Sequence, residues 1–368
     1  MTHHFRYVAH HAYARGMTAI VFIALLAVMN ARSAHQTPAL AASAWTRVEP
    51  GYWVCASNEG SGDLTLIDGR TQHVVATIPL GKRPRGVHAS PDGKLLFVAL
   101  SGSPVTGPPG SAAASRPAPP ADRSADGIGV VDLAQKRLVR VLPGGIDPEE
   151  FAVSHDGGRL FVANEDAATA SMVDVPTGAV AHVAKVDAEP EGVAFSPDGR
   201  NVLVTCETNG TIVELDGRSA AVRARFVVAG RPRSIAFTAD GRHAYIPSET
   251  TAQVHLVDAT THKLERSVTL PAGSRPMKVL LDPEARALFV SNGRGGTVSQ
   301  LDASTGALER TIHVGTRPWG LGMSPDGRWL YVANGPSNDV SVVDTQAGRE
   351  VSRIAAGTGP WGIAVVPR

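Results

Sequence analysis

Seven prolines open seven similar segments of this chain, and the residue that follows each proline varies widely in its chemistry. In chain order these residues are Arg85, Glu149, Glu191, Arg233, Met277, Trp319 and Trp361. Guanidinium groups bind carboxylates and phosphates through paired hydrogen bonds, and indole rings offer flat apolar surfaces. The set therefore predicts a site in which Arg85 and Arg233 bind a small anionic aromatic ligand, bordered by Trp319, Trp361, Glu149 and Glu191.

A second set of seven positions, each directly after a short apolar run, adds acidic groups. These positions hold Glu59, Ser101, Glu165, Glu207, Glu249, Gly293 and Gly335. Carboxylates from three consecutive repeats, Glu165, Glu207 and Glu249, are suitable oxygen ligands for a hard cation such as Ca²⁺. The alternative is that glutamates and arginines at neighbouring positions pair with each other and need no ligand.

His88 is a further candidate, because its position is small or aliphatic in every other repeat. The equivalent residues are Ala152, Ala194, Ala236, Leu280, Gly322 and Ala364. A role in ligand binding or proton transfer is one interpretation. A packed, hydrogen-bonded histidine is the other.

Motifs of the common catalytic classes are absent from the sequence. There is no Gly-x-Ser-x-Gly, no His-Glu-x-x-His and no glycine-rich phosphate loop before a helix. The two cysteines, Cys55 and Cys206, lie outside any Cys-x-x-Cys-His or zinc-binding spacing, and we expect both to be buried and unbridged. These absences favour a function without catalysis.

The candidate residues recur because the chain repeats one unit. The marker prolines lie 64, 42, 42, 44, 42 and 42 residues apart, and an aspartate recurs in step with them from Asp68 to Asp344. Within one repeat, as in Thr316 to Gly348, short apolar runs alternate with turns such as Ser-Pro-Asp-Gly. A period of about 40 to 45 residues with four strands per repeat is typical of a β-propeller.

The two ends of the repeat array are incomplete in complementary ways. Tyr52 to Leu80 supplies the second to fourth strands of a repeat, and Pro360 to Val366 supplies a first strand. Pairing of these ends completes one blade and removes two open strand edges. We therefore predict an all-β, seven-bladed propeller of four-stranded blades over residues 45–368, closed by the C-terminal strand beside the N-terminal blade.

Residues 1–44 lack the repeat and are typical of a signal peptide followed by a short mature segment. Arg6 and Arg15 precede the apolar run Ala19 to Met29, which is shorter than the about 20 residues that span a bilayer. We expect a periplasmic or secreted protein with no stable membrane anchor after cleavage. The balance of 35 Lys and Arg against 34 Asp and Glu, without a basic stripe, argues against nucleic acid as a partner.

One repeat carries an insertion at about residues 102–126, which lengthens the first spacing to 64 residues. Its Pro, Ala, Ser and Gly content predicts a loop that contributes little to any core. A lid over the mouth of the ring is the functional alternative. Removal of Ser103 to Ala125 should leave the protein folded.

Several phrases, among them RPRGVHASPDGKLLFVA and RPWGLGMSPDGRWLYVANGPSNDVSVVD, resemble the YVTN-type propellers. Their order most resembles the β-propeller proteins associated with PQQ-dependent catabolism. The resemblance covers residues 52–366 apart from the insertion, which departs from the family pattern. It implies a secreted propeller linked to quinoprotein alcohol oxidation, and it supplies no catalytic residues.

Three functions follow from these observations. The first is a non-catalytic binding or scaffold propeller for a quinoprotein dehydrogenase, with PQQ as the aromatic polycarboxylate ligand. The second is a lactonase-like hydrolase that uses a central divalent cation held by the glutamates. The third, an electron-transfer subunit, would require a haem or a modified residue, and no attachment motif is present.

Overall fold

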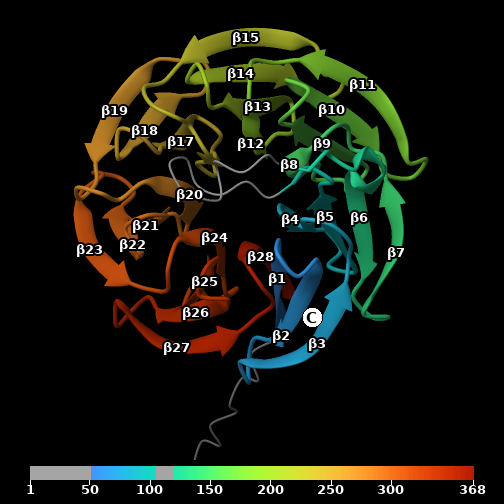
Figure 1. Ribbon diagram of the computed structural model, residues 1–368. Helices are drawn as coiled ribbons and strands as arrows, with labels where there is room; N and C mark the ends of the chain where they lie inside the picture. Colours follow the sequence, from blue (N-terminus) through green and yellow to red (C-terminus); the bar gives the residue numbers. More distant parts are fainter. Residues whose placement is uncertain (1–50, 105–118) are drawn as a thin grey trace, which may run out of the picture. The chain divides into compact units, whose positions relative to one another are not determined.

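The computed structural model describes residues 51–104 and 119–368, which form seven four-stranded antiparallel sheets arranged around one axis (Figure 1). The predicted seven-bladed propeller is therefore confirmed. Blade 1 consists of β28 (Pro360–Pro367), β1 (Tyr52–Asn58), β2 (Asp63–Asp68) and β3 (His73–Pro79). Residues 1–44, where a signal peptide is predicted, lie outside the described residues.

The other blades follow in chain order, each from the innermost strand to the outermost. Blade 2 is β4 (Val87–Ala89), β5 (Leu95–Leu100), β6 (Gly127–Asp132) and β7 (Arg137–Leu142). Blade 3 is β8 (Pro148–Val153), β9 (Arg159–Asn164), β10 (Thr169–Asp174) and β11 (Ala179–Lys185). Blade 4 is β12 (Pro190–Phe195), β13 (Asn201–Cys206), β14 (Thr211–Asp216) and β15 (Val222–Val227).

Blade 5 is β16 (Ala236–Phe237), β17 (His243–Ser248), β18 (Gln253–Asp258) and β19 (Leu264–Thr269). Blade 6 is β20 (Pro276–Leu281), β21 (Ala287–Asn292), β22 (Thr297–Asp302) and β23 (Leu308–His313). Blade 7 is β24 (Pro318–Met323), β25 (Trp329–Asn334), β26 (Asp339–Asp344) and β27 (Arg349–Ala355). Among the described residues no helix is long and apolar enough to cross a membrane.

The ring closes in blade 1 by antiparallel pairing of β28 with β1, as the incomplete ends predict. Val54 is registered against Val365, and Cys55 against Ala364. Next to this pair, the Tyr52 hydroxyl lies 2.9 Å from the Tyr331 hydroxyl of blade 7. The C-terminal strand thus occupies the innermost position of a sheet whose other three strands come from the other end of the propeller.

The core is divided among the interfaces between neighbouring blades. Seven clusters of buried apolar side chains are present in the described part of the chain, each drawn mainly from two adjacent sheets. Between blades 3 and 4, for example, Phe161 and Met172 pack with Val204 and Cys206. Because the strands alternate their side chains between two faces, both faces of each sheet are covered. Cys55 and Cys206 are buried and free, as expected.

The recurring Ser-Pro-Asp-Gly is a turn between the first and second strands, as the sequence indicates. In blade 2 the Leu95 amide donates to the Ser90 hydroxyl at 3.0 Å, and the Lys94 amide donates to Asp92 at 3.1 Å. Gly93 has a φ of +68°, a conformation that glycine adopts without steric cost. The repetition of this motif therefore has a structural reason.

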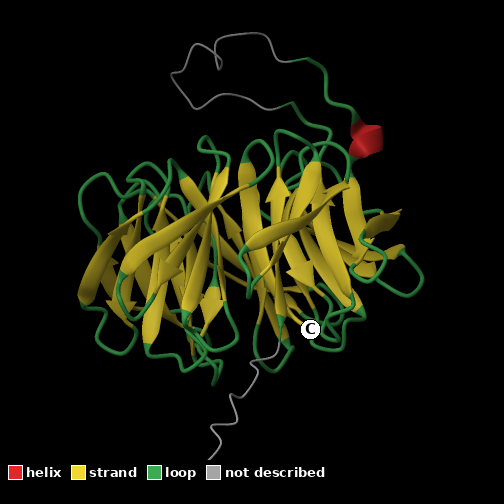
Figure 2. Cartoon of the chain, turned by 90° about the horizontal axis from the view of Figure 1, so that it is seen from below, coloured by secondary structure: helices red, strands yellow, loops and turns green. Residues whose placement is uncertain are grey.

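The two described ends of the insertion are attached to the propeller by polar contacts. Arg123, in a short 3₁₀ helix at Arg123–Ala125, pairs with Asp166 of blade 3 at 2.5 Å, and Ser103 donates to the same carboxylate. Figure 2 shows this helix on one of the two loop-bearing faces of the ring. Residues 105–118, the centre of the predicted loop, lie outside the described residues.

We expect that replacing residues 105–118 by a Gly-Ser link changes the free energy of unfolding by less than about 0.5 kcal/mol, because their composition favours no core. The wider deletion of Ser103 to Ala125 also removes the contacts of Ser103, Asp122 and Arg123. It should cost about 1 kcal/mol more, since these ion pairs are largely solvated. Urea unfolding measures both values, and a loss above about 2 kcal/mol in the shorter deletion would contradict the prediction.

Candidate functional site

The residues that follow the marker prolines lie at one end of the innermost strands. The residue before the proline has a positive φ in most blades, including Asp147 at +57° and Arg317 at +53°. A left-handed backbone costs about 1 to 2 kcal/mol for a residue other than glycine. We call this end of the ring the mouth. The charged residues before the prolines are held there in an unfavourable left-handed conformation, and this conformation turns the chain sharply into the first strand.

Arg85 lies among three carboxylates from two other blades. Its Nε is 3.1 Å from Glu59 of blade 1, and its Nη1 is 3.3 Å from Glu165 of blade 3. It also contacts Glu149 of blade 3, and its side chain is only 8% exposed. Arg83 adds a second guanidinium group 2.9 Å from Glu59.

Arg233 of blade 5 is surrounded in the same way. Its Nη1 is 2.8 Å from Glu191 and 3.6 Å from Glu249, and it also contacts Glu207. Arg231 contacts Glu207 as well. Mutual pairing of arginine and glutamate, the alternative left open by the sequence, is therefore the arrangement that the structure has. An anion that reaches Arg85 or Arg233 must compete with three carboxylates at each.

The three glutamates considered as Ca²⁺ ligands are divided between the two arginines. Glu165 pairs with Arg85, whereas Glu207 and Glu249 pair with Arg233. Carboxylates bound to guanidinium groups are less available to a cation, since their lone pairs already accept charge-assisted hydrogen bonds. Calcium binding by this trio stays a prediction, and the cation would have to displace arginine.

Trp319 and Trp361 lie side by side, with ring centroids 5.3 Å apart and planes inclined by 33°. The guanidinium carbons of Arg233 and Arg317 lie 5.2 and 5.0 Å from the Trp319 centroid. Cation–π attraction of this kind stabilises the pairing of arginine with indole. Much of the flat surface of the Trp319 ring is therefore in contact with other side chains of the protein.

A cavity of about 420 Å³ lies among the innermost strands β4, β20, β24 and β28. Its apolar wall includes Trp319, Trp361, Leu321 and Met323, and its polar groups include His88, Glu150 and Lys278. Small-molecule sites are commonly 300 to 1,000 Å³ in volume and combine an apolar wall with a few polar groups. This axial cavity has both properties.

Three charged or titratable side chains from three blades meet at the axial cavity. His88 Nε2 of blade 2 is 2.7 Å from Glu150 Oε1 of blade 3, and Lys278 Nζ of blade 6 is 2.9 Å from Glu150 Oε2. The His88 ring packs edge-on against Phe151, with centroids 4.9 Å apart. The histidine singled out in the sequence thus has a carboxylate partner, which sequence reasoning missed.

Burial by itself would raise the pKa of Glu150, whose side chain is 7% exposed. The positive charge of Lys278 and the hydrogen bond with His88 outweigh the burial and lower the pKa of this carboxyl to about 2. Glu150 is therefore an anion under ordinary conditions, and it accepts hydrogen bonds from both neighbours.

The repeat contained a pattern from which Glu150 and Lys278 could have been singled out. The second residue after the marker proline is small in five blades and charged in two: Gly86, Glu150, Gly192, Ser234, Lys278, Gly320 and Gly362. A Cβ atom on Gly86 would lie 2.3 Å from Glu150 Oε1, so the carboxylate occupies space that only glycine leaves free. The two exceptions to the small residue are the two that pair across the axis.

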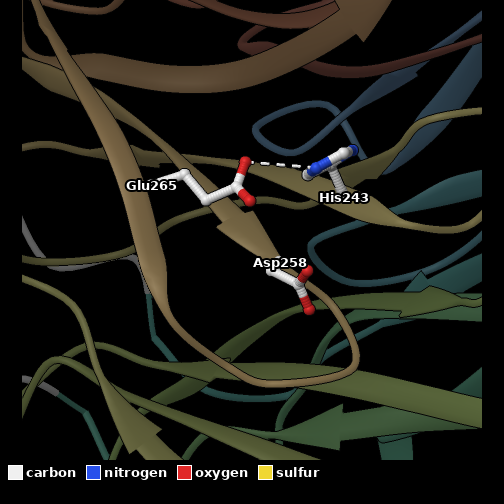
Figure 3. A group of neighbouring side chains, drawn as sticks. All are labelled: His243, Asp258 and Glu265. Atoms are coloured by element: carbon white, nitrogen blue, oxygen red, sulfur yellow. Dashed lines mark ion pairs between the residues drawn. The ribbon is translucent and has the colours of Figure 1, made fainter.

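A separate group of possible metal ligands lies in blade 5, where His243, Asp258 and Glu265 approach one another (Figure 3). His243 Nε2 is 3.1 Å from Glu265, and Asp258 accepts the amides of Thr260 and Thr261 in a turn. These contacts account for the group as a turn cap and a solvated ion pair.

Comparison with known proteins supports the β-propeller fold. A family model described as lactonase, 7-bladed beta-propeller, matches residues 182–355, and a choice-of-anchor I domain model matches residues 56–224. No curated protein matches the chain.

Many solved structures share the fold. Hydrazine synthase of Kuenenia stuttgartiensis superposes with a TM-score of 0.68 at 20% identity, over 79% of this chain and 91% of that one. A proposed 6-phosphogluconolactonase of Bacteroides uniformis gives 0.69 at 18% identity, over 86% and 99%. The dihydro-heme d1 dehydrogenase NirN gives 0.59 at 18% identity, over 82% and 63%. The protein is thus a seven-bladed β-propeller with a polar axial cavity.

Proposed function

We propose that this protein binds a small, flat, anionic molecule in the axial cavity and serves as a periplasmic or secreted binding propeller for a PQQ-dependent alcohol oxidation system. The observation that carries the proposal is the cavity itself, in which Lys278 and His88 face an apolar wall that contains Trp319 and Trp361. The link to a quinoprotein dehydrogenase rests on the sequence resemblance, and the location rests on residues 1–44.

Binding of such a ligand is supported at Lys278 more than at the arginines of the mouth. Lys278 is 27% exposed and makes its ion pair with one carboxylate, whereas Arg233 lies within reach of three. An ammonium group has three donors, so Lys278 can donate a hydrogen bond to a ligand carboxylate as well as to Glu150. The paired arginines and glutamates at the mouth do not line this cavity.

We expect PQQ to quench the tryptophan fluorescence of the protein, because Trp319 and Trp361 line the cavity. Charge-assisted hydrogen bonds are worth about 1.5 to 3 kcal/mol, so Lys278→Met should weaken binding about tenfold to a hundredfold. Lys94→Met is the matched control, since Lys94 is 80% exposed on a turn. Absence of quenching up to millimolar PQQ in the unmodified protein would refute the proposal.

Lactone hydrolysis is the second candidate function. It is favoured by the lactonase family model over residues 182–355 and by the fold shared with a proposed 6-phosphogluconolactonase. In the form predicted from the sequence, a divalent cation held by Glu165, Glu207 and Glu249 polarises the lactone carbonyl. Release of acid from glucono-δ-lactone above the spontaneous rate tests this function.

A further inference from the structure

We infer that His88, Glu150 and Lys278 form a catalytic group in the axial cavity that hydrolyses a cyclic ester by general base catalysis. The inference rests on the second candidate function and names the residues and the substrate class for it. It uses none of the carboxylates that are paired with arginine at the mouth.

His88 has the geometry of an oriented base. Its Nε2 is held by Glu150 at 2.7 Å, and its ring is packed against Phe151. Because an ionised carboxylate only accepts hydrogen bonds, Nε2 carries the proton and Nδ1 has a free lone pair. Among the described residues Nδ1 has no hydrogen-bond partner, and the His88 side chain is 34% exposed and lines the cavity. Nδ1 can therefore accept a proton from a water molecule.

Glu150 is a positioning residue, since it acts through His88. Its carboxylate is 7% exposed and lies between His88 and Lys278, one on each oxygen. This arrangement fixes the tautomer of the imidazole and stabilises the imidazolium that forms when the base takes a proton.

Lys278 supplies positive charge on the same cavity. Nζ uses one donor for Glu150 at 2.9 Å, which leaves two donors on a side chain that is 27% exposed. An ammonium group beside the carbonyl oxygen of a substrate stabilises the negative charge that develops there during attack. Lys278 is thus suited to bind an oxyanion.

The reaction balances without any further reactant. The oxygen of one water molecule forms a bond with the acyl carbon while its proton passes to His88 Nδ1, and the carbonyl oxygen becomes an oxyanion beside Lys278. The ring C–O bond then breaks, and His88 returns the proton to the leaving alkoxide. One lactone and one water give one hydroxy acid, and the protein is unchanged.

The cavity favours a compact ring as the substrate. Its volume of about 420 Å³ and its wall of Trp319, Trp361, Leu321 and Met323 suit a five- or six-membered lactone better than an extended chain. The polar groups lie together on one part of the lining, which favours a substrate with its ester at one edge. We therefore assign small monocyclic lactones as the substrate class.

The test measures hydrolysis of glucono-δ-lactone and γ-butyrolactone by acid release, with the spontaneous rate subtracted. Positioned bases contribute about 10² to 10⁴-fold, so His88→Gln should lower kcat at least about a hundredfold with KM little changed. Glu150→Gln, which removes the charge but keeps an acceptor, should lower kcat and displace the acid limb of the pH–rate profile. Lys278→Met is a second variant that does not touch the base, and it should lower kcat about tenfold or more.

His243→Gln is the matched control, because His243 is a histidine in a carboxylate pair outside the cavity. It should retain full activity, and thermal denaturation should show that every variant is folded. Hydrolysis that persists in folded His88→Gln and Lys278→Met would overturn the catalytic assignment while lactonase activity itself stands. An unmodified protein that hydrolyses neither lactone refutes both, whereas quenching by PQQ would still support the binding site.

Discussion

Deletion of Pro360 to Arg368 should abolish the cooperative thermal transition of the protein. The deleted strand β28 is the innermost strand of blade 1, and its side chains Trp361, Ile363 and Val366 are 7%, 8% and 0% exposed. Burial of each large apolar side chain contributes about 1.5 to 3 kcal/mol, so their loss approaches the whole stability of about 5 to 15 kcal/mol. The truncation also exposes the edge of β1.

Differential scanning calorimetry measures this effect, and deletion of Arg368 alone is the control. That residue is outside the core and contributes an ion pair with Asp68 and a cation–π contact with Trp53. A synthetic peptide of residues 360–368 should restore the transition by strand addition. If the truncated protein melted at the temperature of the full chain, ring closure by β28 would not be a source of stability.

The second large effect is expected for Arg233→Ala, which should lower the free energy of unfolding by about 3 to 5 kcal/mol. The Arg233 side chain is 8% exposed, and its removal leaves Glu191, Glu207 and Glu249 facing one another without this cation. Uncompensated charges of like sign in a poorly solvated site cost far more than the net gain of the intact pairs. The expected loss of stability thus arises because the variant removes the arginine and leaves its glutamate partners in place.

Urea unfolding at neutral pH measures the change, with Arg200→Ala as the control because Arg200 is 79% exposed on a turn. The control should change stability by no more than about 0.5 kcal/mol. Combining Arg233→Ala with Glu207→Gln should recover part of the loss, since one of the facing charges is removed with its counter-ion. A loss below about 1 kcal/mol in the single variant would show that the mouth is well solvated and that its pairs are weak.

The paired mouth also changes what the arginines can do for a ligand. A guanidinium group that is already paired with three carboxylates gains little from a fourth, and the ligand must also displace a bound glutamate. We therefore expect Arg233→Ala to have a larger effect on the stability of the protein than on its affinity for the ligand. Lys278 has a single carboxylate partner in the described residues. Its replacement should therefore change ligand affinity more than stability.

The repeat, the number of blades and the closure of the ring were predictable from the sequence alone. The marker prolines and the recurring aspartates report a period of one blade, and the Ser-Pro-Asp-Gly turn is built from contacts within five residues of chain. The complementary ends imply closure because an unpaired strand edge is costly. Equivalent positions of a repeat meet at equivalent places, so the ring of arginines, glutamates and tryptophans was also predictable.

Which of these residues bind each other was decided by the tertiary structure. Arg85 reaches glutamates of two other blades, 26 and 80 residues away, and a list of ring positions does not say which of them it selects. The choice depends on side-chain length, rotamer and the space left by neighbours, as at Gly86 beside Glu150. For the same reason the sequence left both anion binding and mutual pairing open.

The contact of His88 and Lys278 with Glu150 in the axial cavity could not be predicted from the sequence. His88 was visible as an exception among small residues. Its partner Glu150 is 62 residues from His88 and 128 residues from Lys278 along the chain. The three side chains, from blades 2, 3 and 6, meet only when the ring is closed. A repeat places residues at equal heights around an axis, and it does not tell which long side chains extend across that axis to meet. That meeting depends on the arrangement of the seven sheets in a ring, which the tertiary structure alone provides.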